Sequence, residues 1–187
     1  MKRDGVSLED VAEFGNLIAA SHQAARGHMK KEPVARFFCR MESEVIALQQ
    51  ELLNRVYCPG HFWEFTVRDP KERRIAAAPF RDRVVHHAVC RVIEPTLERY
   101  AIADSYACRK GKGAHKAVRQ AQRWSRQSAW FLKLDVEQFF ASVDHDCLKA
   151  LLFRKFKNPG LLWLLSRIID HAPPSCKRGK GLPVGNL

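Results

Sequence analysis

The stretch Trp130-Phe131-Leu132-Lys133-Leu134-Asp135-Val136 alternates in a way that is typical of a β-strand. Successive side chains of a strand point to opposite faces, so one face would carry Trp130, Leu132, Leu134 and Val136. The other face would carry Phe131, Lys133 and Asp135. The pattern therefore predicts a strand with one buried face and a carboxylate at its end. Such a carboxylate can hold Mg²⁺, with Mn²⁺ as the alternative, or it can merely cap the next turn.

Around this strand the chain is mainly helical. Ser7-Leu8-Glu9-Asp10 predicts a capping box that opens a helix to about Ala25, and a second amphipathic helix is expected from about Val34 to Arg55. Residues 62–67 and 74–78 predict a β-hairpin around the turn-rich link Asp69-Pro70-Lys71-Glu72. Further helices are expected at 82–93, from Pro95 to Tyr100, and at 112–126, 144–156 and 159–171.

The charge is unevenly distributed. Residues 1–65 hold 8 Lys/Arg and 9 Asp/Glu, a net charge of −1, whereas residues 66–187 hold 24 and 11, a net charge of +13. A basic body of this kind suggests a polyanion partner, most simply nucleic acid, although basic charge can also serve solubility alone.

The helix expected at 112–126 concentrates that charge. At 3.6 residues per turn, one side would carry Lys112, Lys116, Arg119, Arg123 and Arg126. The opposite side would carry Ala114, Ala117, Val118, Ala121 and Trp124. From Arg109 through Lys133 there are eight Lys/Arg and no acid, and this segment also includes Lys110. A single-sign stripe favours phosphate contacts over simple solvation, so these residues are predicted to bind nucleic acid.

The six cysteines lie far apart without a C-x-x-C pair, and they suggest reduced thiols in the cytoplasm. A zinc site that includes Cys58 and His61 is disfavoured because structural zinc sites normally show two closely spaced ligand pairs. No run of about 18 apolar residues occurs, so no membrane partner is expected.

Four blocks in order resemble the reverse transcriptase family, over roughly residues 62–187. The first block is Arg73-Arg74-Ile75-x-x-x-Pro79-x-x-Asp82-Arg83 followed by His86-His87-Ala88. The second combines Ile93-Glu94-Pro95 with the segment Asp104–Gly113. The third is Phe131-Leu132-Lys133-Leu134-Asp135-Val136-Glu137-Gln138-Phe139-Phe140, and the fourth is Gly181-Leu182-Pro183-Val184-Gly185-Asn186-Leu187.

The resemblance implies a role for each matching residue. Asp135 would be a catalytic, metal-binding carboxylate, and Val136 would offer its carbonyl to a second metal. Phe140 would crowd the sugar 2′ position and so select deoxynucleotides, although Phe139 or Phe140 could simply pack in a core. Arg73 and Arg74 would hold the incoming triphosphate, because guanidinium presents a fixed fork of donors to phosphate oxygens.

The fourth block departs from the Pro-Gln-Gly pattern of group II intron and retroviral-type enzymes. Pro183-Val184-Gly185 is similar to reverse transcriptases of diversity-generating retroelements, in which loss of the glutamine amide is linked to relaxed base selection. Val184 and Gly185 would contact the nascent base pair, and Val184 cannot donate hydrogen bonds there. The resemblance thus implies an error-prone, retroelement-associated enzyme, with a basic accessory protein as a further partner.

The expected fold is α/β (α+β), with a helical N-terminal extension at 1–60. Fingers with the hairpin and basic helix would occupy 61–128, and a partial palm 129–187. The parent enzyme would extend a DNA primer along an RNA template, with deoxynucleoside triphosphates as substrates. The family's second carboxylate motif, an aromatic-x-Asp-Asp turn, does not occur in these 187 residues. We therefore expect the chain alone to be inactive or nearly so and, with an unpaired sheet edge, marginally stable.

Two other functions remain open. The chain could be a non-catalytic RNA-binding remnant that kept the basic surface. It could also be a metal-dependent nuclease centred on Asp135, although only Glu137, Asp144 and Asp146 are nearby acids in sequence. Asp144-His145-Asp146 lies where a helix should begin, so capping explains it better than metal binding.

Overall fold

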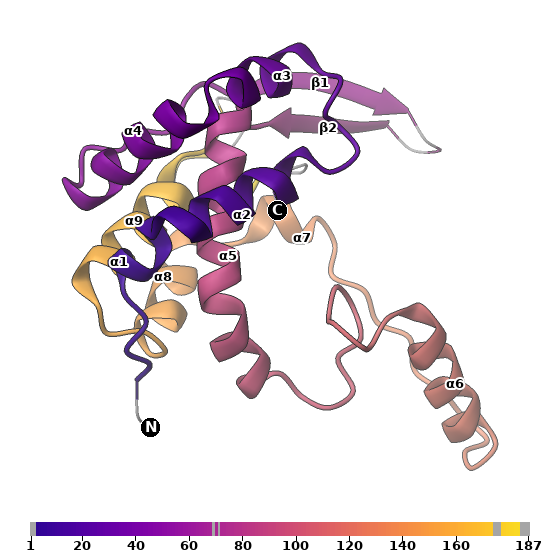
Figure 1. Ribbon diagram of the computed structural model, residues 1–187. Coiled ribbons are helices and arrows are strands. Elements are labelled where there is room, and N and C mark those ends of the chain that lie inside the picture. The colour runs from indigo at the N-terminus through magenta and orange to yellow at the C-terminus, as the bar shows by residue number, and fades with distance from the viewer. Residues whose placement is uncertain (1–2, 69, 71, 174–176, 184–187) are drawn as a thin grey trace. The chain divides into compact units, whose positions relative to one another are not determined.

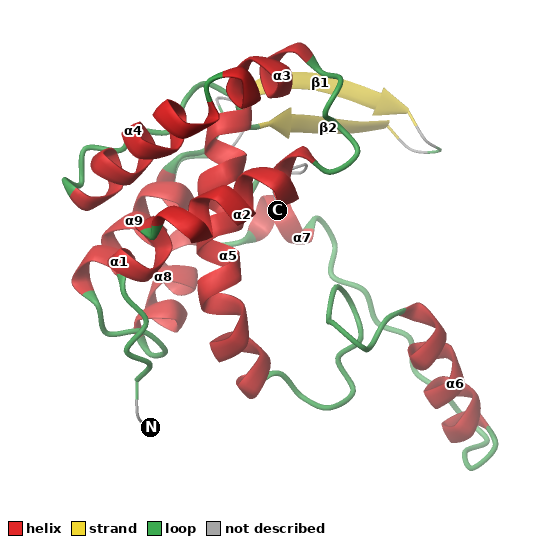
Figure 2. Ribbon diagram, viewed as in Figure 1, coloured by secondary structure: helices red, strands yellow, loops and turns green. Residues whose placement is uncertain are grey.

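A computed structural model describes residues 3–68, 70, 72–173 and 177–183, and it contains helices together with a small two-stranded sheet (Figures 1 and 2). This mixture agrees with the expected α/β class. Two compact units can be distinguished, one of residues 1–93 and 138–187 and the other of residues 94–137. The three functional parts expected from the sequence stay a prediction.

The larger unit is built on helices from both ends of the chain. Its helices are α1 (Leu8–Ala12), α2 (Phe14–Ala25), α3 (Glu32–Cys39), α4 (Met41–Leu53), most of α5 (Phe80–Tyr100), α7 (Phe139–Ser142), α8 (His145–Phe153) and α9 (Pro159–Asp170). One apolar core joins these helices except α7, with fully buried side chains that include Leu17, Leu48, Val84 and Leu161. Each such side chain contributes about 1.5–3 kcal/mol relative to exposure.

The N-terminal residues pack on the α8–α9 region. The Asp4 amide donates to the Lys155 carbonyl at 2.7 Å, and α1 packs against α9. A Cβ added to Gly160 would lie 2.9 Å from Leu8, so only glycine allows this close approach. The first 60 residues and helix α9 therefore contribute to one shared core.

Capping explains where the first helices begin and end. Ser7 and Asp10 form the predicted capping box. The helix then breaks at Glu13, whose carboxylate accepts hydrogen bonds from the Gly15 and Asn16 amides. The single helix expected over 34–55 is likewise two helices, which meet at Arg40. A side-chain cap thus divides the first predicted helix, whereas Arg40 divides the second without a side-chain cap.

The predicted hairpin is confirmed. Strand β1 (Trp63–Arg68) pairs antiparallel with β2 (Glu72–Ala77), in a register that sets Trp63 opposite Ala77 and Arg68 opposite Glu72. Two residues of the link, 69 and 71, lie outside the described residues. The prediction of separate helices before and after Pro95 is wrong, because α5 continues through this proline. A proline removes one backbone hydrogen bond and can bend a helix without ending it.

The smaller unit contains the end of α5 and helix α6 (Ala114–Ser125). The strand expected over 130–136 is wrong: these residues have no regular secondary structure. Trp130 is 90% exposed and Leu132 81% exposed, so the face expected to be buried is open. A strand needs a neighbour for its N–H and C=O groups, and the sheet formed by the described residues contains β1 and β2 alone.

Candidate nucleic-acid interface and carboxylate site

Helix α6 presents the predicted basic stripe. It begins after Gly113, whose φ of +87° favours glycine, and none of its side chains, all within the described residues, is buried. Lys116, Arg119 and Arg123 are exposed on one face, and Arg126 continues that face at the C-cap. The opposite face is also open, since Trp124 is 46% exposed. The exposed stripe offers its charges to solvent and to any polyanion.

Arg109 is engaged inside its own loop. It donates to the Glu98 carboxylate, with Nε 2.8 and 2.9 Å from the two oxygens, and also to the carbonyls of Ile102 and Ser105. The guanidinium bond holds the pKa of Glu98 below its usual value. Arg109 thus folds the segment that precedes α6, and its predicted phosphate contact would have to compete with these bonds.

Lys112 is engaged in the same loop. Its Nζ donates to the Ala103 carbonyl at 2.6 Å and lies 5.4 Å from the centre of the Tyr106 ring. Lys110 between these two residues is exposed. Of the seven residues predicted to contact nucleic acid, five therefore present exposed side chains, and two stabilise the loop.

Asp135 lies in the exposed extended segment of the smaller unit. Its Oδ1 accepts from the Val136 amide at 3.0 Å, so the carboxylate caps its own next residue. The described residues contain no group of three or more His, Cys, Asp or Glu side chains that could hold a metal ion. One carboxylate and the neighbouring Val136 carbonyl are suitable Mg²⁺ ligands, but they supply only part of a coordination shell.

Phe140 lies on α7, in the larger unit. Phe139 and Phe140 are 53% and 50% exposed and touch edge to face, with ring centres 5.4 Å apart. Neither belongs to the core, so core packing does not explain them. The preceding Gln138 has a left-handed backbone, with φ +49°, which turns the chain into α7. Such strained residues are often found at functional sites.

Arg73 and Arg74 are neighbours on β2 and are both exposed. Arg73 pairs with Val67 and Arg74 with Thr66, so their side chains lie on opposite faces of the hairpin. One face carries Trp63, Phe65, Val67, Arg73, Ile75 and Ala77. A triphosphate bound on either face would meet one of the two guanidinium groups directly, not both. Val184 and Gly185 lie outside the described residues.

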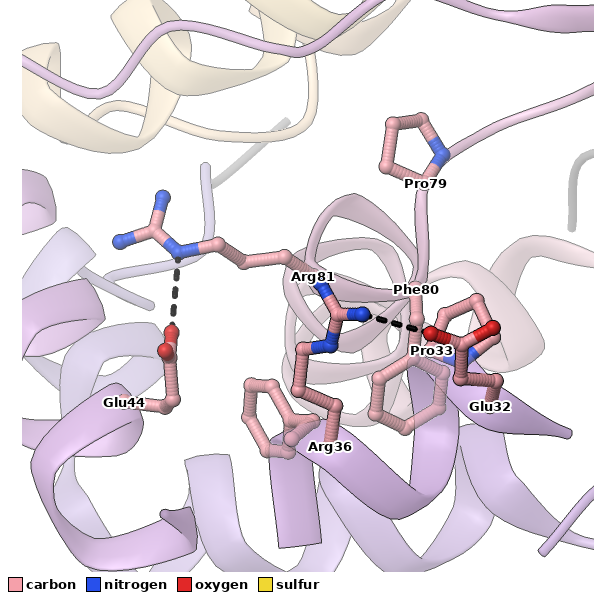
Figure 3. Close-up of a pocket in the computed structure, with 8 residues that line it drawn as sticks. Glu32, Pro33, Arg36, Glu44, Pro79, Phe80 and Arg81 are labelled. Carbon is pink, nitrogen blue, oxygen red and sulfur yellow. Dashed lines mark hydrogen bonds and ion pairs between the residues drawn. The ribbon is translucent and has the colours of Figure 1, made fainter. Parts of the chain in front are cut away.

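A cavity lies between α3, α4 and the start of α5 (Figure 3). Its volume is about 310 Å³, and apolar walls are formed by Pro33, Phe37, Pro79 and Phe80. The charged groups at its rim are paired with one another: Arg36 with Glu32 at 2.6 Å, and Arg81 with Glu44 at 3.7 Å. These pairs leave no unpaired charge for a ligand, so the cavity is not a strong candidate site.

A buried histidine was not identified as functional from the sequence. Asp144 caps α8 as predicted, accepting from the Asp146 and Cys147 amides. His145 beside it is buried and bonds to the Gly181 carbonyl. The two residues lie 36 positions apart, so no local sequence pattern pointed to this contact.

The chain is similar in sequence to proteins that are named for introns. No protein-family model matches the chain. It is 31% identical over 98 residues to "Nuclear intron maturase 1, mitochondrial" of Arabidopsis thaliana, which covers 51% of this chain and 14% of that protein. It is 23% identical over 112 residues to "Putative COX1/OXI3 intron 1 protein" of Saccharomyces cerevisiae, or 57% of the chain and 13% of the relative.

The chain is similar to intron maturases. A match to "Protein YkfC" of Escherichia coli is longer, with 24% identity over 164 residues, 79% of the chain and 42% of the relative. Since maturases are related to reverse transcriptases, the similarity supports the reverse-transcriptase-like family expected from the motifs. The names of the maturases and of the COX1/OXI3 intron 1 protein point to introns and not to diversity-generating retroelements.

The matched part is a small share of the maturase-like proteins. The chain spans about 14% of the length of the curated relatives it matches first. No helix among the described residues is long and apolar enough to cross a membrane. The expected cytoplasmic location stays a prediction.

Proposed function

We propose that this chain is part of a reverse-transcriptase-like, intron-associated protein and that it binds RNA through the basic surface of residues 109–133. The observation that carries the proposal is α6, on which Lys116, Arg119 and Arg123 share one exposed face with Arg126 following. Eight Lys/Arg and no acid occur between Arg109 and Lys133. Phosphate groups are the ligands that such a stripe attracts without regard to sequence.

The similarity to maturases supports RNA as the polyanion, since those relatives are named for introns. Exposed Trp124, Trp130 and Phe131 lie in the same unit. Aromatic rings next to basic side chains suit single-stranded RNA, because unpaired bases can stack on them. We therefore expect single-stranded RNA to bind more tightly than duplex.

A charge-reversal pair tests this proposal on the chain itself. R119E/R123E reverses two charges on the α6 stripe, and K30E/K31E makes the same charge change at two exposed lysines of the larger unit. Fluorescence anisotropy with a labelled single-stranded RNA should show weakened binding for R119E/R123E and near-native binding for the control. Equal losses would mean that overall charge, not α6, attracts the RNA.

We further propose that the full-length parent is an RNA-directed DNA polymerase that extends a DNA primer on an RNA template. In this proposal Asp135 and the Val136 carbonyl hold Mg²⁺, which would neutralise charge on the transferred phosphate when bound. Phe140 would exclude the sugar 2′-hydroxyl, and Arg73 or Arg74 would bind the triphosphate. The hairpin register supports a binding role for only one of the two arginines at a given face, since they face opposite sides.

The identity of Val184 extends the proposal to low fidelity, as in diversity-generating retroelements. An amide at this position could hydrogen-bond near the nascent pair, whereas an isopropyl group cannot. In the polymerising full-length protein, Val184→Gln should therefore reduce misincorporation at template adenines. Equal error rates before and after the substitution would remove the argument for a mutagenic enzyme.

A further inference from the structure

The segment 177–182 folds back onto the region between α7 and α8. The Leu182 amide donates to the Phe140 carbonyl at 2.7 Å, and the Gly181 amide donates to the Val143 carbonyl at 2.8 Å. The His145 amide donates to the Gly179 carbonyl at 3.1 Å. Gly179 and Gly181 have φ of +73° and +88°, a backbone conformation that L side chains rarely adopt. These turns and bonds form a short irregular ladder.

The His145 side chain also bonds to this ladder. It is 2% exposed, and its Nε2 lies 2.8 Å from the Gly181 carbonyl oxygen. A carbonyl oxygen can only accept, so Nε2 carries the hydrogen. A buried donor that loses its acceptor is costly, which ties the ring and the segment together.

Two charged side chains border the ring on its other side. Nδ1 of His145 lies 3.4 Å from Oδ1 of Asp170, at the end of α9. Lys149 on α8 holds that carboxylate, with its Nζ 3.0 and 3.2 Å from the two oxygens. Asp170 and Lys149 thus border the imidazole on the side away from Gly181.

We propose that His145 is a positioning residue that holds segment 177–182 in register with Phe140. The direct bond from the Leu182 amide to the Phe140 carbonyl means that a shift of this segment would move it relative to the sugar-selecting residue. The importance of this register for nucleotide selection rests on the proposed function, in which Phe140 contacts the sugar and Val184, two residues after Leu182, contacts the base. The positioning itself does not depend on that function.

Hydrogen exchange of the whole chain, followed by NMR at single amides, tests the proposal. H145A should accelerate exchange of the Gly181 and Leu182 amides by about 5- to 30-fold, the effect of losing 1–2 kcal/mol locally, while the amides of α2 and α9 keep their rates. H145Q can place a donor where Nε2 lies, so it should restore most of the protection. An unchanged rate in H145A, or no rescue by H145Q, would overturn the proposal.

A second histidine provides a matched control. Nε2 of His171 also lies 2.8 Å from a carbonyl oxygen, that of Gly60, in the same unit. H171A should leave Gly181 and Leu182 unchanged, and uniform acceleration in both variants would instead indicate general destabilisation and overturn the positioning role. RNA affinity, measured alongside, should be equal in wild type and H145A. If no form, including wild type, bound RNA, the proposed function would be contradicted and the exchange result would still stand.

Discussion

Tyr57 donates its phenolic hydrogen to Oδ1 of Asp82 across 2.7 Å, and both side chains are buried. Oδ2 of the same carboxylate accepts from the Gly60 amide at 2.8 Å. Burial, followed by the nearby Asp82 charge, raises the pKa of Tyr57 well above its usual value. The loop that leads into the hairpin is thereby fixed to the first turn of α5.

Removing the Tyr57 hydroxyl should destabilise the larger unit. Y57F leaves the buried Asp82 carboxylate with one donor fewer, which costs about 1–3 kcal/mol. Urea unfolding at neutral pH measures this loss. Y106F is the control, because the Tyr106 hydroxyl bonds to Asp104 at an exposed position, and little change is expected there. Equal stabilities of Y57F and wild type would contradict the role of the bond.

Stability should fall as the pH falls from about 6.5 to about 4. Burial lowers the pKa of His86 from 6.5 to about 4. Over this interval the unfolded chain binds a proton at His86 and the folded chain does not, so protonation favours unfolding. The neutral His86 side chain contributes about 3 kcal/mol to the free energy of unfolding; this contribution is complete above pH 6.5 and lost by pH 4.

Unfolding free energies measured from pH 4 to pH 7 test this dependence. H86Q should flatten the curve, while H115Q, at an exposed position on α6, should retain the wild-type slope. Some slope should remain in H86Q, because burial also lowers the pKa of His87. Parallel curves for H86Q and wild type would assign the dependence to other groups.

The main role of Arg109 should be to stabilise the loop before α6, not to bind RNA. R109A removes the bonds to Glu98 and to two carbonyls, so exchange and proteolysis of residues 101–113 should accelerate. R126A, which removes the same charge at the exposed end of α6, should leave this loop unchanged and weaken RNA binding. The reverse pattern would show that Arg109 is the phosphate ligand.

The exposed segment 130–136 should make the chain self-associate. Leu132 and Leu134 are each 81% exposed, and open extended segments pair readily with other chains. L132E/L134E should lower light scattering at high protein concentration. L53E/L151E changes two other exposed leucines and should not, since both lie on helices. Wild-type chain that stays monomeric at high concentration would contradict this expectation.

Local signals in the sequence were enough to predict several elements. Ser7 and Asp10 identified a helix start, and the link around Pro70 identified the hairpin, because caps and turns depend on neighbouring residues. The basic face of α6 followed from helical spacing alone. These features need no knowledge of distant contacts.

The errors arose where distant contacts decide the outcome. The alternation around Leu132 predicted a buried strand, but a strand forms only with a partner, and sequence period does not show whether one is present. Pro95 predicted a helix end that α5 does not have. The bond between His145 and Gly181 joins residues 36 positions apart, so no local pattern could reveal it.

The salt dependence of RNA binding tests the central claim most directly. Single-stranded RNA should be titrated with the whole chain at several potassium chloride concentrations. Four exposed stripe residues, Lys116, Arg119, Arg123 and Arg126, predict that affinity falls by roughly 3 log units per log unit of salt, at about 0.7 for each phosphate neutralised. R119E/R123E should lower that slope by about 1.4. Binding that does not change with salt, or no binding at low salt, would contradict the account.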